Sequence, residues 1–258
     1  MENVTYEQLG QVAVITLNRP EKRNAIDARM AHAIASALDR VETDPTIRAA
    51  VLAATVTEPR PVFCSGHDLT AIPGELEGGE LAATSKGGFA GMTRYERTKP
   101  LVAAVDGLAT SGGLEMVLAC DLVVATTRSS FALAEVRWGL VAGAGGLFRL
   151  PWAIGPAAAM DMILTGEAID AQRAYTLGLV GTLVEDDVVA AAVHRAELVC
   201  AHSPAAVTVS RRVADCAFAL PETELWALND RLEHDLLATD EGVGQGLQAF
   251  AQRGSATS

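Results

Sequence analysis

Strand patterns alternate with helical patterns through about the first 155 residues of the chain, and helical patterns alone follow. The runs 12–17 and 101–105 are almost entirely apolar and predict buried strands. After the first of them, Asp27 is placed to cap a helix whose apolar residues recur every three or four positions, namely Ile26, Met30, Ile34, Leu38 and Val41. Strands and helices that alternate at this spacing predict an α/β core with crossover connections.

The remaining elements are expected from the same periodicities. Strands are expected at 47–53 and 122–125, and a short strand that runs into a Gly turn is expected at 62–66. Helices are expected at 112–119, 157–164, 171–177, 187–201, 204–216, 222–237 and 243–253. Residues 70–92 are rich in Gly, Ala, Glu and Ser and predict a mobile, partly helical binding loop. The apolar helices of the C-terminal part need a surface to pack on, which either the chain's own core or a neighbouring subunit could supply.

Charge and composition exclude several classes of function. Among 258 residues, 20 Lys and Arg face 32 Asp and Glu, which gives a net charge of −12 and argues against nucleic acid as the main partner. No apolar run approaches the ~18 residues that a membrane helix needs, and no signal pattern opens the chain, so a cytoplasmic protein is expected. The five histidines lack the spacing of metal ligands, and no metal site is expected.

Two glutamates are candidates for proton transfer. Glu115 lies between a Gly-Gly pair and an apolar run, and Glu135 lies within the apolar sequence FALAEV. An apolar environment destabilises a carboxylate, raises its pKa and so favours proton exchange near neutral pH. If both face one cavity, they could divide the work of acid and base. The alternative is that Glu115 only complements a helix N-terminus and that Glu135 is a solvated turn residue.

Two glycine turns are candidates for binding a negative charge. Ser65-Gly66 follows a strand, and Gly112-Gly113 opens a helix after another strand. Such turns present unpaired backbone N–H groups, and two of them could clamp a developing oxyanion. The alternative is that each glycine only permits a tight turn. The glycine-rich stretch 143–146 lacks the Lys-Ser/Thr ending of a nucleotide-phosphate loop, so that ligand is not expected.

Taken together and in order, these motifs resemble the crotonase (enoyl-CoA hydratase/isomerase) superfamily. The resemblance covers nearly the whole chain and rests on Asn18-Arg19-Pro20, Asn24-Ala25, FCSGHDL at 63–69, PLVAAVDGLATSGGLEMVLACDL at 100–122, Glu135, the glycines at 143–146, LTG at 164–166, Ala174 and GLV at 178–180. It implies an α/β fold, a crotonase-like spiral of ββα repeats in residues 1–195, carrying the coenzyme A and catalytic sites. It also implies a helical trimerisation region in residues 196–258, and a homotrimer or a dimer of trimers.

The resemblance implies a role for each matching position. The backbone N–H groups of Ser65 and Gly112 would form the oxyanion hole for a thioester carbonyl, and Glu115 and Glu135 would be the acid/base pair. Residues that would line the coenzyme A and substrate site are Arg23, Ala25, Ser65, Gly66, His67, Asp68, Leu69, Gly112, Phe250 and Arg253. Basic side chains at 19, 22 and 23 could attract the phosphates of coenzyme A despite the global negative charge.

The implied activity is a hydro-lyase of lipid and fatty-acid metabolism that adds water reversibly to a 2-enoyl-CoA thioester. Its partner is the acyl-CoA, with coenzyme A as part of the substrate and no further cofactor. Both glutamates are present, which favours hydration over the double-bond isomerase alternative. Residues 87–93 resemble the carnitinyl-CoA dehydratase branch, and a non-catalytic acyl-CoA-binding protein is the alternative of a different class. Ser111, Ala134 and His67 depart from the residues usual in the family, and His67 could narrow the acyl pocket or face solvent.

Overall fold

The computed structural model describes residues 2–238 and 243–244. The chain divides into two compact units, Met1–Glu197 and Leu198–Ser258. Every candidate site residue that the structure describes belongs to the first unit. Among the described helices, none combines the length and the apolar character that a membrane span requires.

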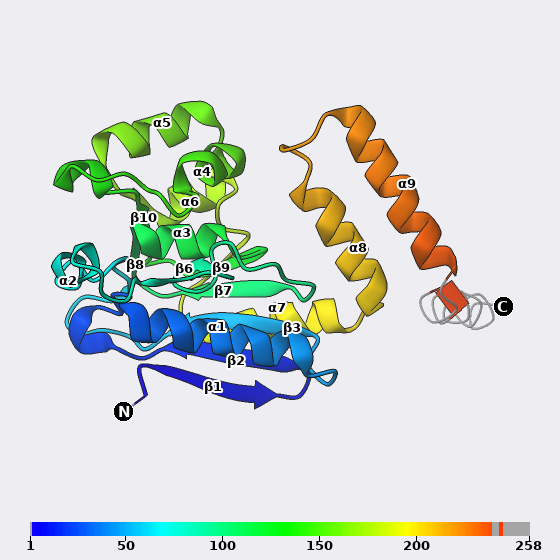
Figure 1. Cartoon of the computed structure of the whole chain (residues 1–258), viewed down its shortest axis with the longest axis horizontal. Helices are drawn as coiled ribbons and strands as arrows, with labels where there is room; N and C mark the ends of the chain where they lie inside the picture. Colours follow the sequence, from blue (N-terminus) through cyan, green and yellow to red (C-terminus); the bar gives the residue numbers. More distant parts are fainter. Residues whose placement is uncertain (1, 239–242, 245–258) are drawn as a thin grey trace. The chain divides into compact units, whose positions relative to one another are not determined.

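A six-stranded sheet forms the base of the first unit (Figure 1). Its order is β1-β2-β3-β7-β9-β12, with strands at Val4–Leu9, Val12–Leu17, Ala49–Ala54, Leu101–Val105, Leu122–Thr126 and Thr182–Val184. All neighbours are parallel except β1 and β2. The central strands β3 and β7 are buried on both faces, which explains why their sequences are continuous apolar runs. Strand β1 was not predicted, because most residues of this edge strand are exposed and it contains no continuous apolar run.

A second sheet has four strands, in the order β11-β10-β8-β4. Its strands are Ile169–Asp170, Ser130–Ala132, Leu108–Thr110 and Val62–Cys64, and β4, β8 and β10 run parallel. Three times, a strand of the six-stranded sheet is followed in the chain by a strand of the four-stranded sheet. The pairs are β3 and β4, β7 and β8, and β9 and β10. Because β4, β8 and β10 are parallel neighbours, the segments that follow these three strands begin at the same edge of the four-stranded sheet.

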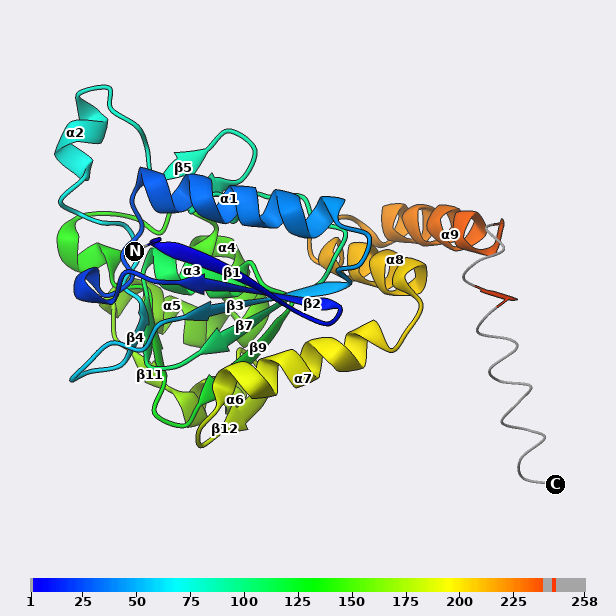
Figure 2. The same cartoon turned by 90° about the horizontal axis from the view of Figure 1, so that it is seen from below.

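Helices and short helical turns complete the first unit (Figures 1 and 2). They are η1 (Pro20–Lys22), α1 (Ala28–Thr43), α2 (Ile72–Leu76), α3 (Gly112–Leu118), η2 (Glu135–Trp138), α4 (Gly146–Ile154), α5 (Pro156–Thr165), α6 (Ala171–Leu177) and α7 (Val188–Cys200), which runs into the second unit. The predicted cap of α1 is confirmed, because the Asp27 carboxylate accepts a hydrogen bond from the Met30 N–H at 2.9 Å. Helix α4 was not predicted, because its glycine-rich start and internal Pro151 obscure the helical pattern.

The expected loop at 70–92 contains helix α2 and a small hairpin of β5 (Ala83–Thr84) and β6 (Gly88–Phe89). The second unit contains α8 (Pro204–Asp215) and α9 (Glu222–Ala238), which contact each other. Ser203 caps α8 through the N–H of Ala206, as the Ser-Pro sequence predicted. The helix expected at 243–253 lies mostly outside the described residues.

Candidate active site

Three turns meet at the carboxyl edge of the four-stranded sheet, and each carries one group of candidate residues. The first follows β4 and contains Ser65, the second follows β8 and opens α3, and the third follows β10 and opens η2 at Glu135. Since β4, β8 and β10 are parallel neighbours, residues far apart in the sequence come together here.

The first turn is held by a buried asparagine. The amide nitrogen of Asn24 donates hydrogen bonds to the carbonyls of Thr55, Val62 and Phe63, and its oxygen accepts from the Arg19 N–H at 3.0 Å. Asn24 is fully buried and joins the loop after β2 to the end of β4. It therefore fixes the position of the turn that follows β4, a role that the sequence alone did not reveal.

The hydrogen bonds of this turn correct one predicted donor. The Ser65 N–H donates to the carbonyl of Arg23 at 3.1 Å, so it is engaged rather than open. Ile26 pairs with the turn through the Gly66 carbonyl and the Asp68 N–H, which directs the N–H of His67 to the opposite side. Among the described residues, the His67 N–H has no acceptor. The open donor of this turn is therefore the N–H of His67.

The second turn brings another open donor against the first. Gly112 is the first residue of α3, so its N–H has no acceptor within the helix. A Cβ atom on Gly66 would lie only 2.8 Å from this nitrogen, which shows how closely the two turns approach. Ser111, with φ of 53°, holds the sharp entry to α3, and its N–H donates to the Ala132 carbonyl at 2.9 Å. The two turns thus present the N–H groups of His67 and Gly112 side by side.

Glu115 is held as an acceptor on α3. Its side chain is almost fully buried, and Oε1 accepts hydrogen bonds from the N–H groups of Ala144 at 2.7 Å and Gly146 at 2.8 Å. Burial raises the pKa of Glu115 above its ordinary value, while these two N–H groups and the charge of Arg149 oppose the shift. Oε1 is therefore occupied by the protein, and Oε2 is left to meet a ligand.

Glu135 lies at the start of η2 and is 9% exposed. Its Oε2 is buried without a hydrogen-bond donor in the part of the chain that the structure describes. The pKa of Glu135 is raised to about 7, mainly by burial and further by the charge of Glu115, while hydrogen bonds from its own backbone and the Ser111 side chain oppose the shift. Such a carboxyl exchanges protons readily near neutral pH.

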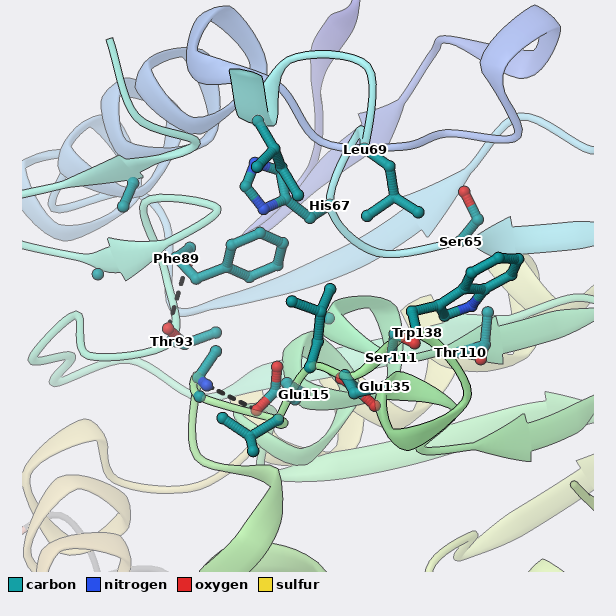
Figure 3. Close-up of a pocket in the computed structure, with 18 of the residues that line it drawn as sticks. Ser65, His67, Leu69, Phe89, Thr93, Thr110, Ser111, Glu115, Glu135 and Trp138 are labelled. Atoms are coloured by element: carbon teal, nitrogen blue, oxygen red, sulfur yellow. Dashed lines mark hydrogen bonds between the residues drawn. The ribbon is translucent and has the colours of Figure 1, made fainter. Parts of the chain in front are cut away.

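Both glutamates and both open N–H groups face one cavity of about 660 Å³ (Figure 3). Its apolar lining includes Leu69, Ile72, Phe89, Trp138, Leu140 and Val141, and its polar lining includes Ser65, His67, Thr84, Ser85, Thr93, Arg94, Thr110 and Ser111. The prediction that the two carboxyl groups meet at one cavity agrees with this arrangement. A volume of this size accommodates a small-molecule group of moderate size.

His67 and its neighbours form one wall of the cavity. The His67 Nε2 is 2.9 Å from Oε1 of Glu75 on α2, and its ring meets Phe89 edge to face with centroids 5.9 Å apart. The Phe89 ring also covers Gly112, since a Cβ atom there would lie 2.6 Å from Cε1 of Phe89. Of the two alternatives for His67, the structure favours a side chain that narrows the pocket.

Asp68 and Leu69 play different parts. Burial opposes ionisation of Asp68, but hydrogen bonds from Thr70 and the Arg19 guanidinium, 2.9 Å away, outweigh it and hold the pKa of Asp68 below its usual value. Asp68 is thus bound within the protein and does not line the cavity, whereas Leu69 does and is half exposed.

The residues predicted to contact coenzyme A are only partly placed. Arg23 is exposed on the loop that carries Asn24, while Ala25 is buried and its carbonyl accepts from Arg19 at 3.0 Å. Neither lines the cavity. Phe250 and Arg253 lie outside the described residues. Within those residues, no group of His, Cys, Asp and Glu side chains is arranged to hold a metal ion.

Sequence reasoning missed Phe89 and Arg94 as cavity residues. Both lie in the segment expected as a loop, where no periodicity indicated which side chains face inward. The signal that could have drawn attention to them is the GGFAGMT stretch at 87–93, because its glycines allow close backbone approach.

Comparison with known proteins places this geometry in a family. The model of the family described as "Enoyl-CoA hydratase/isomerase" matches residues 7–257. The (E)-benzylidenesuccinyl-CoA hydratase of Thauera aromatica is 37% identical over 252 residues, which cover 97% of this chain and 96% of that protein. A carnitinyl-CoA dehydratase of Proteus mirabilis is 38% identical over 177 residues, which cover 68% of this chain and 65% of that protein.

A solved structure agrees with the sequence comparisons. The crystal structure of an enoyl-CoA hydratase from Mycobacterium tuberculosis H37Rv has a TM-score of 0.89 and 36% identity, over 98% of this chain and 97% of that one. This match confirms the predicted crotonase-like α/β fold with a helical C-terminal region. The relatives are named as hydratases and dehydratases, which are hydro-lyases, as the resemblance implied. The chain therefore belongs to the enoyl-CoA hydratase/isomerase family, the crotonase superfamily.

Proposed function

We propose that the protein adds water reversibly across the C=C bond of a 2-enoyl-CoA thioester, with Glu115 and Glu135 as the acid/base pair. The observation that carries the proposal is that two buried glutamates face one cavity together with two unpaired backbone N–H groups. A hydration needs a base for water, an acid for Cα and a stabiliser for the enolate oxygen, and this set offers all three.

Glu115 is assigned to the water. Its Oε1 is bound by two N–H groups, which favour the ionised form, and its free oxygen can accept a hydrogen bond from water and take its proton. Glu135 is assigned to Cα. With a pKa of about 7 it is protonated in a large share of molecules at neutral pH, and it can deliver its proton as water adds to Cβ.

The developing enolate oxygen is assigned to the N–H groups of His67 and Gly112. This proposal replaces the predicted Ser65 donor, whose N–H is bound to Arg23. Each donor to such an oxyanion contributes roughly 3 kcal/mol in the transition state. Both N–H groups belong to turns fixed by buried contacts, so they need no reorganisation when charge develops.

Coenzyme A is assigned to the side of the cavity that carries Ser65. There the loop 18–25 presents the exposed side chains of Lys22 and Arg23, which can attract phosphates against the net charge of −12. The acyl group then extends from the oxyanion donors past Phe89. Figure 3 supports this direction, because Ser65 lies on the right of the view, whereas Phe89 and the His67 ring lie together on the left.

A dehydration in the cell, such as that named for the carnitinyl-CoA dehydratase relatives, is the second candidate. It uses the same groups in reverse, and the 87–93 stretch noted above supports it. As in the resemblance, we also propose a homotrimer or a dimer of trimers, which light scattering of the purified protein would identify.

Crotonyl-CoA provides the direct test of the activity. Hydration removes the ultraviolet absorbance of its conjugated thioester, and the product is identified as 3-hydroxybutyryl-CoA by chromatography. A parallel reaction with a 3-enoyl-CoA measures isomerisation. Conversion of that substrate to the 2-enoyl isomer, with no net addition of water to either thioester, would favour the isomerase. Tight acyl-CoA binding without turnover of any chain length would favour a non-catalytic binding protein.

A further inference from the structure

Arg94 is a cavity-lining side chain that the proposed mechanism does not use. Among the residues that the structure describes, no carboxylate or other acceptor is bound by its guanidinium; only its backbone N–H is engaged, with the Gly87 carbonyl at 2.8 Å. Other arginines around the site are bound, such as Arg19 to Asp68 at 2.9 Å and Arg149 to the Thr93 carbonyl at 2.8 Å. Arg94 therefore offers an unneutralised positive charge at the cavity.

The stem of Arg94 is placed by a glycine. A Cβ atom on Gly88, which has a φ of +65°, would lie 2.9 Å from Cγ and 3.1 Å from Cδ of Arg94. Gly88 also lines the cavity and directly precedes Phe89 in β6. The two residues of β6 thus form adjacent parts of the cavity wall. Phe89 contacts Gly112, whose N–H is the second donor, and Gly88 contacts the aliphatic stem of Arg94.

This order defines a path for the acyl group. From the thioester oxygen at the His67 and Gly112 N–H groups, the acyl chain is assigned a path past Phe89, which covers Gly112, to the β5–β6 hairpin, where Gly88 pairs with Thr84 and contacts the Arg94 stem. The end assigned to coenzyme A lies at Ser65, on the side of Figure 3 opposite Phe89. The charge of Arg94 is therefore offered to the acyl group and not to the coenzyme A phosphates.

We infer that the protein selects 2-enoyl-CoA thioesters whose acyl group carries a carboxylate, which Arg94 binds. This inference rests on the proposed function, because it takes the direction of the acyl group from it. A guanidinium binds a carboxylate with two parallel hydrogen bonds, a geometry that a lysine cannot reproduce. Ser85 also lines the cavity and directly follows Thr84, the hairpin partner of Gly88, so its hydroxyl is a further donor available to that carboxylate.

Binding of saturated thioesters tests the inference without turnover. Calorimetry would compare matched pairs of equal length with and without a terminal carboxylate: succinyl- and butyryl-CoA, adipoyl- and hexanoyl-CoA, and suberoyl- and octanoyl-CoA. We expect the carboxylate member of at least one pair to bind about tenfold or more tightly. In Arg94→Gln this preference is lost while the affinity for the uncharged member and for free coenzyme A is unchanged, and Arg94→Lys restores part of it.

Arg173→Gln is the matched control, because it removes the same charge from α6, which contributes no residue to the cavity. It is expected to keep the preference. No preference in any wild-type pair, or an equal loss of affinity for free coenzyme A in Arg94→Gln, overturns the inference. Turnover of the corresponding 2-enoyl thioesters separates the two proposals. Hydration without a carboxylate preference contradicts only the role of Arg94, whereas the expected binding without hydration contradicts the proposed function.

Discussion

The charge of Glu115 raises the pKa of Glu135, although the two side chains come from successive turns of the spiral. The effect requires the two carboxyl groups to lie close together in a medium of low polarity. Burial supplies that medium and is the larger cause of the shift. The pair therefore holds one proton over a range of pH in which isolated glutamates would hold none.

The pH dependence of kcat/KM should reflect this pair. The active form carries one proton, so activity falls on the alkaline side as the pKa of Glu135, about 7, is passed. On the acid side it falls as Glu115 is protonated, above the ordinary range of a glutamate because burial raises its pKa. Initial rates of crotonyl-CoA hydration from about pH 5 to about pH 9 measure both limbs.

The same profile is expected for dehydration of 3-hydroxybutyryl-CoA. Water addition consumes no net proton, so the ratio of the two kcat/KM values equals a pH-independent equilibrium constant. A flat profile across neutral pH would contradict the raised pKa of Glu135.

Exchange at Cα should separate the roles of the two glutamates. In deuterated water, a saturated thioester such as butyryl-CoA should exchange a Cα proton through Glu135 alone, because no water is added. We expect Glu135→Gln to lower the exchange rate about 100-fold or more, and Glu115→Gln to leave it within about tenfold. NMR spectroscopy of the thioester measures the exchange. A large loss of exchange in Glu115→Gln and a small one in Glu135→Gln would show that the two assigned roles are the wrong way round.

Gly66→Ala tests the close approach of the two turns. The new methyl group would lie 2.8 Å from the Gly112 nitrogen, at a φ of +91°, and would push the second donor out of place. We expect kcat/KM for crotonyl-CoA to fall about 100-fold or more. Gly10→Ala is the matched control, because it has a φ of +60° but open space around it. If both variants lose the same small amount of activity, the approach of the turns has no catalytic importance.

Asn24→Ala tests what holds the first turn. It removes the donor to three carbonyls and the acceptor for the Arg19 N–H, and leaves buried groups unpaired. The free energy of unfolding should fall by at least about 2 kcal/mol, which urea denaturation measures. Asn3→Ala, just before β1, should cost much less. Equal stability of the two variants would show that the Asn24 contacts contribute little.

The sequence was informative wherever a local pattern decides the structure. Strands 12–17 and 101–105 and helix 171–177 were predicted at their observed bounds, because continuous apolar runs and caps are local signals. Edge strand β1 and helix α4 were missed, because neither carries such a signal. The spiral itself and the roles of its residues came from the resemblance to a family rather than from periodicity.

The engaged N–H of Ser65 could not be predicted from its neighbours in sequence. Which N–H group of this turn remains open depends on its pairing with Ile26 and on the carbonyl of Arg23, both far earlier in the chain. Arg94 was missed for a similar reason. Its place depends on Gly88 and the β5–β6 hairpin, in a segment without periodicity.

The most direct measurement is the rate of crotonyl-CoA hydration by the wild type, Glu115→Gln, Glu135→Gln and the double variant, with Glu7→Gln on the exposed edge of β1 as the control. We predict that each single variant loses about 100- to 10,000-fold in kcat with unchanged folding, and that the double variant is far less impaired than the product of the two losses. The control should keep wild-type activity. Full activity in either single variant would contradict the account, because one carboxyl group would then suffice for both proton transfers.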